Sequence, residues 1–402
     1  MKTITDEKKI DEVLDRGTIV QILPTKKEFK ERLMSGDRLS FYIGFDATAP
    51  TLHLSHAKNL MLLEKFRKLG HEVIMLFGDF TARIGDPTGE STARNQLTRE
   101  DVMENVKTWK RLIKPLMNFD DTENSPLIKY NNDWLSVLTF EDVIKLASNL
   151  TVQQMLERDM FDKRIKEGKP IHLHEFLYPL MQGYDSVAMD VDVELCGTDQ
   201  IFNALTGRTL LRKLKNKDKF VVAVTLMENP KTGELMSKSK GTGVFLDVSA
   251  NDMYGQVMAQ PDEMIEVLFV NLTDIPLSEI KEIVNQEDKR DVKMKLALEI
   301  TKIFHGTDIA TGAQENFIQT FQKGNVPDDI EDFKVSEGAN IIDVLVSGKL
   351  ASSKSEARRL IEQGGVKLDG VKIESIDYVF ESNEDEIILQ KGKRFFLRLL
   401  SS

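Results

Sequence analysis

The sequence has very little cysteine: Cys196 is the single one among 402 residues. One cysteine cannot form a disulfide within the chain, and it excludes zinc sites built from several thiolates. Long apolar runs are also lacking, since none approaches the ~20 residues that span a bilayer. The charged N-terminal stretch MKTITDEKKIDEVLDRG has no apolar segment of a secretory signal. These absences predict a cytoplasmic protein with no membrane partner.

Acidic residues outnumber basic ones, and the net charge is −11. This balance argues weakly against a nucleic-acid partner, but phosphates are bound by local patches and not by the net charge. Basic residues gather at 207–220 and again in the C-terminal region, including 391–398, with an acidic turn at 381–386. Because the basic residues are concentrated in separate segments, the net charge does not exclude an RNA partner.

The first half of the chain alternates apolar runs typical of strands with helical patterns. The patterns predict strands at 38–45, 72–78 and 220–227, and helices at 56–71, 99–117, 139–160, 174–190 and 198–214. The nearly continuous apolar run 72–78 is typical of a buried parallel strand. Alternating strands and helices predict a doubly wound, Rossmann-like α/β domain with a parallel sheet.

The second half changes character twice. Residues 250–322 show helix after helix, and a stretch rich in Gly, Pro and acidic residues follows. The last sixty residues combine a helical pattern with an Asp-Gly hairpin and further short strands. We therefore expect an α/β domain at 1–235, a loop and all-helical domain at 236–325, a linker at 326–340 and a small α+β domain at 341–402.

Two histidines, His53 and His56, stand three apart in PTLHLSHAKNL at the start of a predicted helix. Such a pair shares one helix face, so both could bind one metal ion, but no third ligand stands at a diagnostic spacing. They could also be ordinary core histidines. A third interpretation is that their N–H groups bind a polyphosphate together with the free backbone N–H groups of a helix N-terminus.

A second motif, GELMSKSKGTG, covers residues 233–243 after the predicted strand 220–227. It is short, cationic and rich in Gly and Ser. One interpretation is a solvated basic loop. The other is a mobile loop whose Lys238, with Ser237 and Ser239, closes over the pyrophosphate part of ATP.

Taken together, these motifs resemble those of class I aminoacyl-tRNA synthetases, and specifically of the bacterial-type tyrosyl-tRNA synthetase family. HLSH stands where the class carries His-Ile-Gly-His, and LMSKS where it carries Lys-Met-Ser-Lys-Ser. The narrower resemblance depends on FYIGFDATAPTLHLSH, ARIGDPTGESTAR, NNDWL, HEFLYPLMQGYDSV and ELCGTDQIFN. The C-terminal LASSKSEARRLIEQGGVKLDGVKI is similar to an S4-type RNA-binding domain. The resemblance covers nearly the whole chain.

The resemblance implies a tyrosine pocket. Tyr42 and Asp185 match the residues that contact the phenol hydroxyl, which needs one donor and one acceptor. Asp86, Tyr178 and Gln182 match those that bind the α-amino group. Tyr178 and Gln182 are four apart and Asp185 follows three later, so all three share one helix face. Gln200 is expected near the substrate carboxyl group.

The resemblance also implies an ATP site and a set of catalytic groups. It assigns catalysis to Thr48, His53, His56 and Lys238. It assigns ATP binding to Gly44, Asp46, Gly197, Asp199, Met236, Ser237 and Ser239. The implied substrates are L-tyrosine, ATP with Mg²⁺ and tRNA(Tyr), with no structural metal.

In the implied reaction the tyrosine carboxylate attacks the α-phosphorus of ATP, and a ribose hydroxyl of tRNA then takes the tyrosyl group. The carboxylate is already ionised at neutral pH, so the first step depends on positioning and charge stabilisation. The S4-like region, with Lys354, Arg358 and Arg359, is expected to bind RNA. The family is homodimeric, and we expect a homodimer here.

Three positions depart from the family pattern. Ser55 replaces the motif glycine that lets adenine pack closely, and Leu235 replaces the first lysine of the second motif. Glu90 stands where several relatives have a lysine, although Arg94 is nearby.

Other functions remain compatible with the sequence. Tryptophan activation is the nearest, because Asp185 could accept an indole N–H. An S4-containing RNA-binding protein with an inactive nucleotide domain is another. A nucleotidyltransferase with a His-x-x-His motif is the third, but it would not need the S4-like tail.

Overall fold

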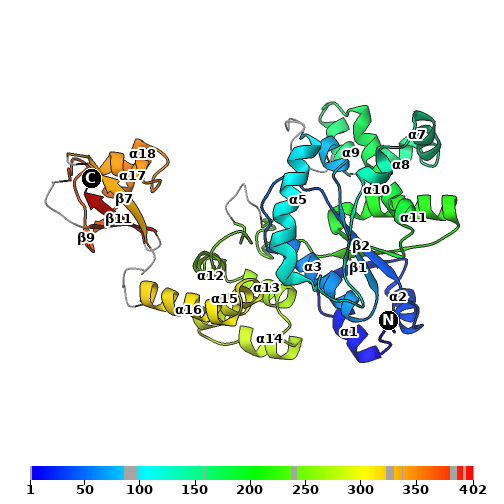
Figure 1. Cartoon of the computed structure of the whole chain (residues 1–402), viewed down its shortest axis with the longest axis horizontal. Helices are drawn as coiled ribbons and strands as arrows, with labels where there is room; N and C mark the ends of the chain where they lie inside the picture. The colour runs from blue at the N-terminus through cyan, green and yellow to red at the C-terminus, as the bar shows by residue number, and fades with distance from the viewer. Residues whose placement is uncertain are drawn as a thin grey trace. The chain divides into compact units, whose positions relative to one another are not determined.

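A computed structural model describes residues 2–85, 97–156, 159–236, 242–322, 330–336, 338–380, 387–392 and 395–401. The chain forms two compact units, Met1–Ala310 and Thr311–Ser402 (Figure 1). Each unit is described by itself. Within the described ranges, no helix combines the length and the apolar character needed to cross a membrane.

A six-stranded sheet forms the centre of the N-terminal unit. Its strands are β1 (Ile19–Leu23), β2 (Ser40–Phe45), β3 (Glu72–Phe77), β4 (Leu127–Tyr130), β5 (Val193–Gly197) and β6 (Phe220–Val224). Their order is β1-β6-β5-β2-β3-β4, and all pairs are parallel except β1 with β6. The predicted doubly wound parallel sheet is confirmed, and β2, β3 and β6 lie where the sequence places them.

Helices surround this sheet. They are α1 (Glu7–Leu14), α2 (Lys26–Met34), α3 (Leu54–Lys68), α4 (Thr81–Ile84), α5 (Arg99–Ile113), α6 (Asn132–Leu135), α7 (Phe140–Ala147), α8 (Val152–Leu156), α9 (Asp159–Lys166), α10 (Leu173–Met189) and α11 (Ile201–Lys215), with 3₁₀ turns η1 (Lys114–Leu116) and η2 (Thr198–Gln200). Helix α3 packs on β2 and β3, whereas α11 packs on β5 and β6.

Two details of the N-terminal unit differ from expectation. The predicted helix 139–160 is interrupted between α7 and α8, because the Thr151 hydroxyl accepts the N–H of Gln154 and caps a new helix. Strands β1, β4 and β5 were not predicted. Strands β1 and β4 are edge strands with few buried positions, so they lack a strong apolar signal. Strand β5 is central and buried, but it is short and includes the charged residue Glu194.

A helical segment follows the sheet. Its helices are α12 (Ala250–Met258), α13 (Met264–Leu272), α14 (Leu277–Val284), α15 (Lys289–His305) and α16 (Thr307–Gln322). Up to Ala310 this segment belongs to the same compact unit as the sheet. Arg16, just before β1, connects this segment to the part of the unit that contains the sheet. Its guanidinium donates to the carbonyls of Val270, at 2.8 Å, and Ile275, at 3.0 Å.

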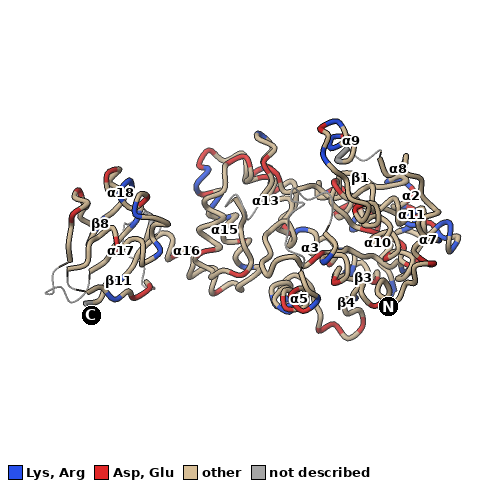
Figure 2. The backbone as a smooth tube through the Cα atoms, turned by 90° about the horizontal axis from the view of Figure 1, so that it is seen from above, with Lys and Arg blue, Asp and Glu red and all other residues tan. Residues whose placement is uncertain are grey.

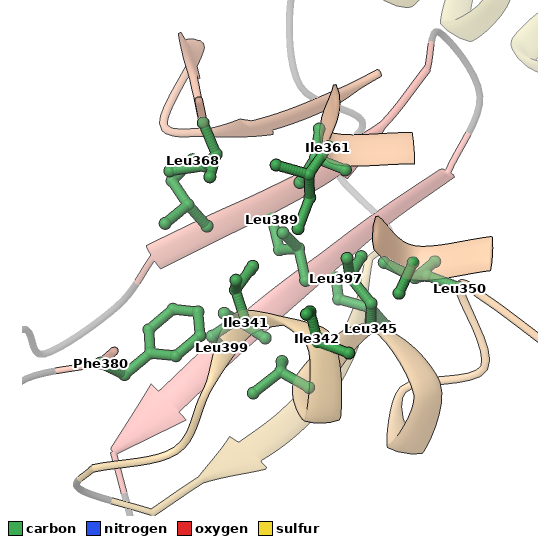
Figure 3. Close-up of a cluster of buried hydrophobic side chains, with 14 of the residues drawn as sticks. Ile341, Ile342, Leu345, Leu350, Ile361, Leu368, Phe380, Leu389, Leu397 and Leu399 are labelled. Atoms are coloured by element: carbon green, nitrogen blue, oxygen red, sulfur yellow. The ribbon is translucent and has the colours of Figure 1, made fainter. Parts of the chain in front are cut away.

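The C-terminal unit has its own five-stranded sheet, ordered β7-β11-β10-β8-β9. Its elements are β7 (Glu331–Val335), α17 (Ile341–Ser347), α18 (Lys354–Glu362), β8 (Val366–Leu368), β9 (Val371–Lys372), β10 (Ile387–Lys391) and β11 (Phe395–Ser401). Figure 3 shows its core, where side chains of α17 and α18 such as Leu345 and Ile361 meet Leu389 and Leu397 of the sheet.

Of two predictions for the C-terminal region, the Asp-Gly hairpin is confirmed and the linker is wrong in part. Asp369 and Gly370 have φ values of +45° and +81°, as a tight turn between β8 and β9 requires. The expected linker 326–340, in contrast, contains β7, which pairs in parallel with β11. The linker prediction is therefore wrong for residues 331–335, because this pairing depends on a strand more than sixty residues away.

Candidate active site

A cavity of about 370 Å³ lies at the carboxyl ends of the central strands. From β2 the chain continues to β3 and β4 on one side, whereas β5 and β6 lie on the other side. The border between β2 and β5 is thus a topological switch point, where open α/β sheets bind ligands. The cavity walls come from β2, β5, the first turn of α3 and one face of α10.

Helix α10 presents the predicted polar stripe. Tyr178, Gln182 and Asp185 all line the cavity, so the i, i+4, i+7 spacing correctly placed them on one face. The helix begins with a capping box, in which the Glu175 carboxylate accepts the backbone N–H of His172 at 2.8 Å. It ends at Asp190, whose φ of +54° is left-handed.

Asp185 is buried, with 3% of its surface exposed, and two donors hold its carboxylate. The Trp134 indole N–H donates to Oδ1 at 2.7 Å, and the Asn131 amide donates to Oδ2 at 3.3 Å. Burial nevertheless raises the pKa of Asp185 well above its usual value, and nearby Glu194 and Asp46 add to the shift. The result is a fixed carboxyl group on the cavity wall.

Tyr42 lies on β2 and packs near α10, the helix that carries Asp185; 1% of the Tyr42 surface is exposed. Its hydroxyl is 2.9 Å from the Ser186 hydroxyl, which belongs to α10. Burial raises the pKa of Tyr42 well above its usual value, so the phenol keeps its proton at neutral pH. The cavity therefore contains one phenolic O–H and one carboxyl group from Tyr42 and Asp185.

Asp46 follows β2 and connects several walls of the cavity. The Tyr178 hydroxyl donates to its Oδ2 at 2.8 Å, and the Thr81 hydroxyl donates to its Oδ1 at 2.7 Å. Gly78 makes this arrangement possible, because a Cβ there would lie 2.0 Å from Asp46 Oδ1. A carboxylate in this position can bind a cationic group such as an ammonium.

Amide side chains form a second network along the cavity. The Gln182 amide donates to Glu194 Oε1 at 3.1 Å, and the Asn203 amide donates to Gln182 Oε1 at 2.9 Å. Asn203 also donates to Gln200 Oε1 at 2.8 Å. Gln182 and Gln200 are thereby held in defined orientations. Such preorganised amides can orient a polar substrate without reorganising.

The histidine pair lies at the first turn of α3. His53 is the N-cap residue, and its backbone N–H donates to Nδ1 of His56 at 3.4 Å. His56 lines the cavity, and the edge of the Trp109 ring system meets it with ring centres 5.4 Å apart. Burial, with the neighbouring His53, lowers the pKa of His56 to about 3. His56 is therefore neutral, and because Nδ1 accepts, its Nε2 carries the proton.

The two sequence motifs are neighbours in space. Leu54 N–H donates to the Val244 carbonyl at 3.1 Å, and Leu246 N–H donates to the Leu52 carbonyl at 2.9 Å. The segment just after the second motif is thus paired with the segment that carries His53. The two ends of that motif also meet, because the Thr242 hydroxyl donates to the Leu235 carbonyl at 3.3 Å.

The predicted site residues divide into three groups. Ten line the cavity: Tyr42, Gly44, Asp46, His56, Tyr178, Gln182, Asp185, Gly197, Asp199 and Gln200. Three described residues are not part of the cavity wall: exposed Thr48, half-buried His53 and buried Met236. Four others, Asp86, Ser237, Lys238 and Ser239, lie outside the described residues, as do Glu90 and Arg94.

Sequence reasoning missed several polar residues of the site. Thr81, Asn131 and Glu194 line the cavity, and Trp134 and Ser186 contact its functional groups. A signal existed for Glu194, a carboxylate inside the otherwise apolar run VELCG. Ser55, discussed as a departure from the family pattern, also lines the cavity.

The predicted RNA-binding residues lie in the C-terminal unit. Lys354, Arg358 and Arg359 are all exposed on α18, where Figure 2 shows basic segments beside acidic ones, and Lys354 pairs with Asp343 at 2.6 Å. The other basic stretch, 207–220, lies mostly on α11. There Arg212 pairs with Asp218 at 2.6 Å, so part of its charge is neutralised locally.

Two family models match the chain. The model described as tRNA synthetases class I (W and Y) matches residues 34–322, and the one described as a tyrosine–tRNA ligase SYY-like C-terminal domain matches residues 321–399. Together they match residues 34–399, which include parts of both compact units.

Several known proteins are similar to this chain. A tyrosine–tRNA ligase of Thermotoga maritima is 43% identical, covering 98% of each chain. A tyrosine–tRNA ligase 2 of Clostridium acetobutylicum is 42% identical, over 93% of this chain and 94% of the relative. Among solved structures, a truncated Aspergillus nidulans mitochondrial tyrosyl-tRNA synthetase is 23% identical and has a TM-score of 0.64. The match covers 78% of this chain and 94% of that protein, and it supports the fold. The chain belongs to the tyrosine–tRNA ligase family of class I aminoacyl-tRNA synthetases.

Proposed function

We propose that the cavity at the β2–β5 switch point is where L-tyrosine reacts with ATP, as expected of this family. The observation that carries the proposal is the meeting of three elements at one point. These are the polar stripe of α10, the phenol of Tyr42 and the first turn of α3 with His56. Tyrosine would bind between the first two, and the phosphates of ATP near the third.

The tyrosine side of the site is supported by complementary groups. Tyr42 and Asp185 offer a donor and an acceptor for a buried phenol hydroxyl, which a Trp or Phe substrate would not match. Asp46, Tyr178 and Gln182 offer oxygens for the α-amino group. Asp86, which the family resemblance also assigns to this group, is included in the proposal.

For ATP, we assign Gly44, Asp46, Gly197 and Asp199 to the nucleoside and the motif residues Met236, Ser237 and Ser239 to the phosphates. A Cβ at Gly197 would lie 2.4 Å from Asp199 Oδ1, so a side chain there would disturb the neighbouring carboxylate. We propose Thr48, His53, His56 and Lys238 as the catalytic donors. Mg²⁺ would enter with ATP.

The proposed first step needs no general base. The tyrosine carboxylate oxygen forms a bond to the α-phosphorus, the bond to the bridging oxygen breaks, and pyrophosphate leaves. Neutral His56 donates its Nε2–H to the phosphate oxygens where negative charge develops. In the second step a terminal ribose hydroxyl of tRNA attacks the activated carbonyl, and AMP leaves.

The helical segment and the C-terminal unit would bind tRNA, with Lys354, Arg358 and Arg359 contacting phosphates. Phosphate contacts by exposed cations weaken with salt and add affinity without base specificity. Replacing these three residues by alanine should raise the KM for tRNA and leave adenylate formation unchanged. Alanine at Lys26 and Lys27, exposed cations of α2, serves as the control. An unchanged KM for tRNA would contradict this assignment.

We further propose a cytoplasmic homodimer. Residues 137–173 carry large apolar side chains that are more than half exposed, among them Phe140 at 81% and Leu173 at 79%. An exposed apolar surface of this kind favours a second copy as its cover. Phe140→Asp should produce monomers in light scattering, whereas Val371→Asp, at a site 70% exposed in the C-terminal unit, should not. Dimers in both variants would refute this interface.

The first experiment on the function is amino-acid-dependent exchange between ATP and pyrophosphate. Tyr, Trp and Phe are compared side by side on the whole chain. Exchange with Tyr alone supports the phenol pocket. Exchange with Trp keeps the two-step chemistry but contradicts the roles of Tyr42 and Asp185, and no exchange contradicts the proposed site as a whole.

A further inference from the structure

A buried ion pair lies directly behind the tyrosine pocket. Lys219 and Glu194 are 1% and 2% exposed, and the Lys219 ammonium contacts the Glu194 carboxylate. The same ammonium donates to the Ser186 hydroxyl at 2.5 Å. Burying two charges costs more than their attraction returns unless further hydrogen bonds satisfy them. A buried pair at this position therefore calls for a functional explanation.

The chain makes specific room for this lysine. Lys219 directly precedes β6 and extends to where α10 and α11 approach each other closely. A Cβ at Gly207 would lie 2.7 Å from Lys219 Nζ and 2.8 Å from Ser186 Oγ. Any other residue at position 207 would thus displace the ammonium or the hydroxyl.

The hydrogen-bond directions follow from the number of protons. An ammonium only donates, so Ser186 Oγ accepts from Lys219 and has a single proton left to give. Two acceptors are in reach: Tyr42 Oη at 2.9 Å and Glu194 Oε2 at 3.4 Å. Because the ammonium already satisfies Glu194 Oε2 and Tyr42 is nearer, the Ser186 proton goes to Tyr42. Tyr42 therefore does not donate to Ser186, and its own proton can go to a group in the cavity or to Glu194, which also hydrogen-bonds Tyr42.

We propose that Lys219 is a positioning residue that, through Ser186, makes the Tyr42 hydroxyl a donor toward the phenol oxygen of the substrate. This inference rests on the proposed function, in which Tyr42 and Asp185 bind that phenol. Asp185, held by its own two donors, accepts the substrate proton. Without Lys219, the Ser186 hydroxyl donates its proton to Glu194, and the Tyr42 hydroxyl donates to Ser186. The phenol oxygen of the substrate then has no donor from Tyr42. Lys219 thereby sets the preference for tyrosine over phenylalanine.

The test is the ratio of kcat/KM for Tyr to kcat/KM for Phe in ATP–pyrophosphate exchange. Lys219→Met should lower this ratio about tenfold, the factor that one hydrogen bond carries. Ser186→Ala should lower it as well, because Tyr42 loses the donor that fixes its orientation and its proton turns to Glu194. Adding Glu194→Gln to Lys219→Met should restore much of it. Gln182 still donates to the Oε1 position, so the new amide turns its N–H toward Ser186 and again leaves Tyr42 as the acceptor.

Lys58→Met is the matched control. Lys58 is equally buried, at 2% exposed, and its ammonium contacts the Thr225 carbonyl without reaching Tyr42. It should lower thermal stability and leave the ratio unchanged. A ratio that falls equally in Lys58→Met, or stays constant in a folded Lys219→Met, overturns the inference. If Lys219→Met does not fold, an unchanged ratio in Ser186→Ala overturns it.

Tyr42→Phe separates this inference from the function on which it rests. If Tyr42→Phe leaves the ratio unchanged, the proposed phenol pocket itself is wrong. If Tyr42→Phe lowers the ratio but Lys219→Met and Ser186→Ala do not, the pocket stands and only the role of Lys219 is refuted.

Discussion

The state of His56 leads to a prediction that distinguishes a neutral from a charged catalytic histidine. The backbone N–H of His53 occupies Nδ1 of His56, and burial lowers the pKa of His56 to about 3. The ring should therefore act through its neutral Nε2–H. His56→Gln keeps an amide donor near that position, whereas His56→Ala removes it.

The expected magnitudes follow from these contacts. Removing one preorganised donor to a developing negative charge typically costs ~10²–10³ in rate. His56→Ala should therefore slow tyrosyl-adenylate formation by that factor, and His56→Gln by clearly less. His56→Ala also removes the acceptor of the His53 N–H at the helix N-terminus and should lower stability, whereas the Gln amide oxygen can replace that acceptor. Tyrosine affinity should barely change, because His56 stands apart from the phenol and amino groups.

The assay is single-turnover adenylate formation from pH 5.5 to pH 8, with tyrosine affinity measured separately. A group with a pKa near 3 stays neutral over this whole range, so its titration should produce no loss of rate as the pH rises. An imidazolium donor with an ordinary pKa of ~6.5 would lose activity above that value. Refutation would be a rate that falls between pH 6 and pH 7.5 in the wild type but not in His56→Gln.

Three further predictions concern other residues. Asp185→Asn should weaken tyrosine binding. Because the raised pKa of Asp185 makes the fold less stable as the pH rises, the variant should also lose less stability with rising pH than the wild type; intact binding with an unchanged pH dependence would contradict this. His71 is fully buried and its pKa is lowered to about 4, so its neutral form stabilises the fold above pH 6.5. By pH 5 the free energy of unfolding, measured in urea titrations, should have fallen by about 2 kcal/mol. In His71→Gln this decrease should be smaller. Ser55→Gly should lower or preserve the KM for ATP, since Ser55 lines the cavity and glycine leaves more room there; a large increase would show that the serine binds the nucleotide.

Much of the site was predictable because it is local in sequence. Helical spacing alone put Tyr178, Gln182 and Asp185 on one face, and the cavity contains all three. The apolar run 72–78 similarly predicted a buried parallel strand, which is β3. Short motifs and periodic patterns are properties of neighbouring residues, so a single sequence displays them.

Features that depend on distant residues were not predictable in this way. Three of the five residues in the run 331–335 are charged, and its parallel pairing with β11 makes it a strand. Nothing in the sequence distinguishes Ser186 from its neighbours in α10, because its partners Tyr42, on β2, and Lys219, just before β6, are far away along the chain.

The sequence by itself thus determined the alternating elements, the two motifs and the chemical groups that face a tyrosine and a nucleotide. Only the tertiary structure decided which protons those groups present. The reason is physical: hydrogen-bond direction and pKa depend on burial and on partners such as Lys219 with Glu194, which are separated by 25 residues and brought together only when β5 and β6 pair.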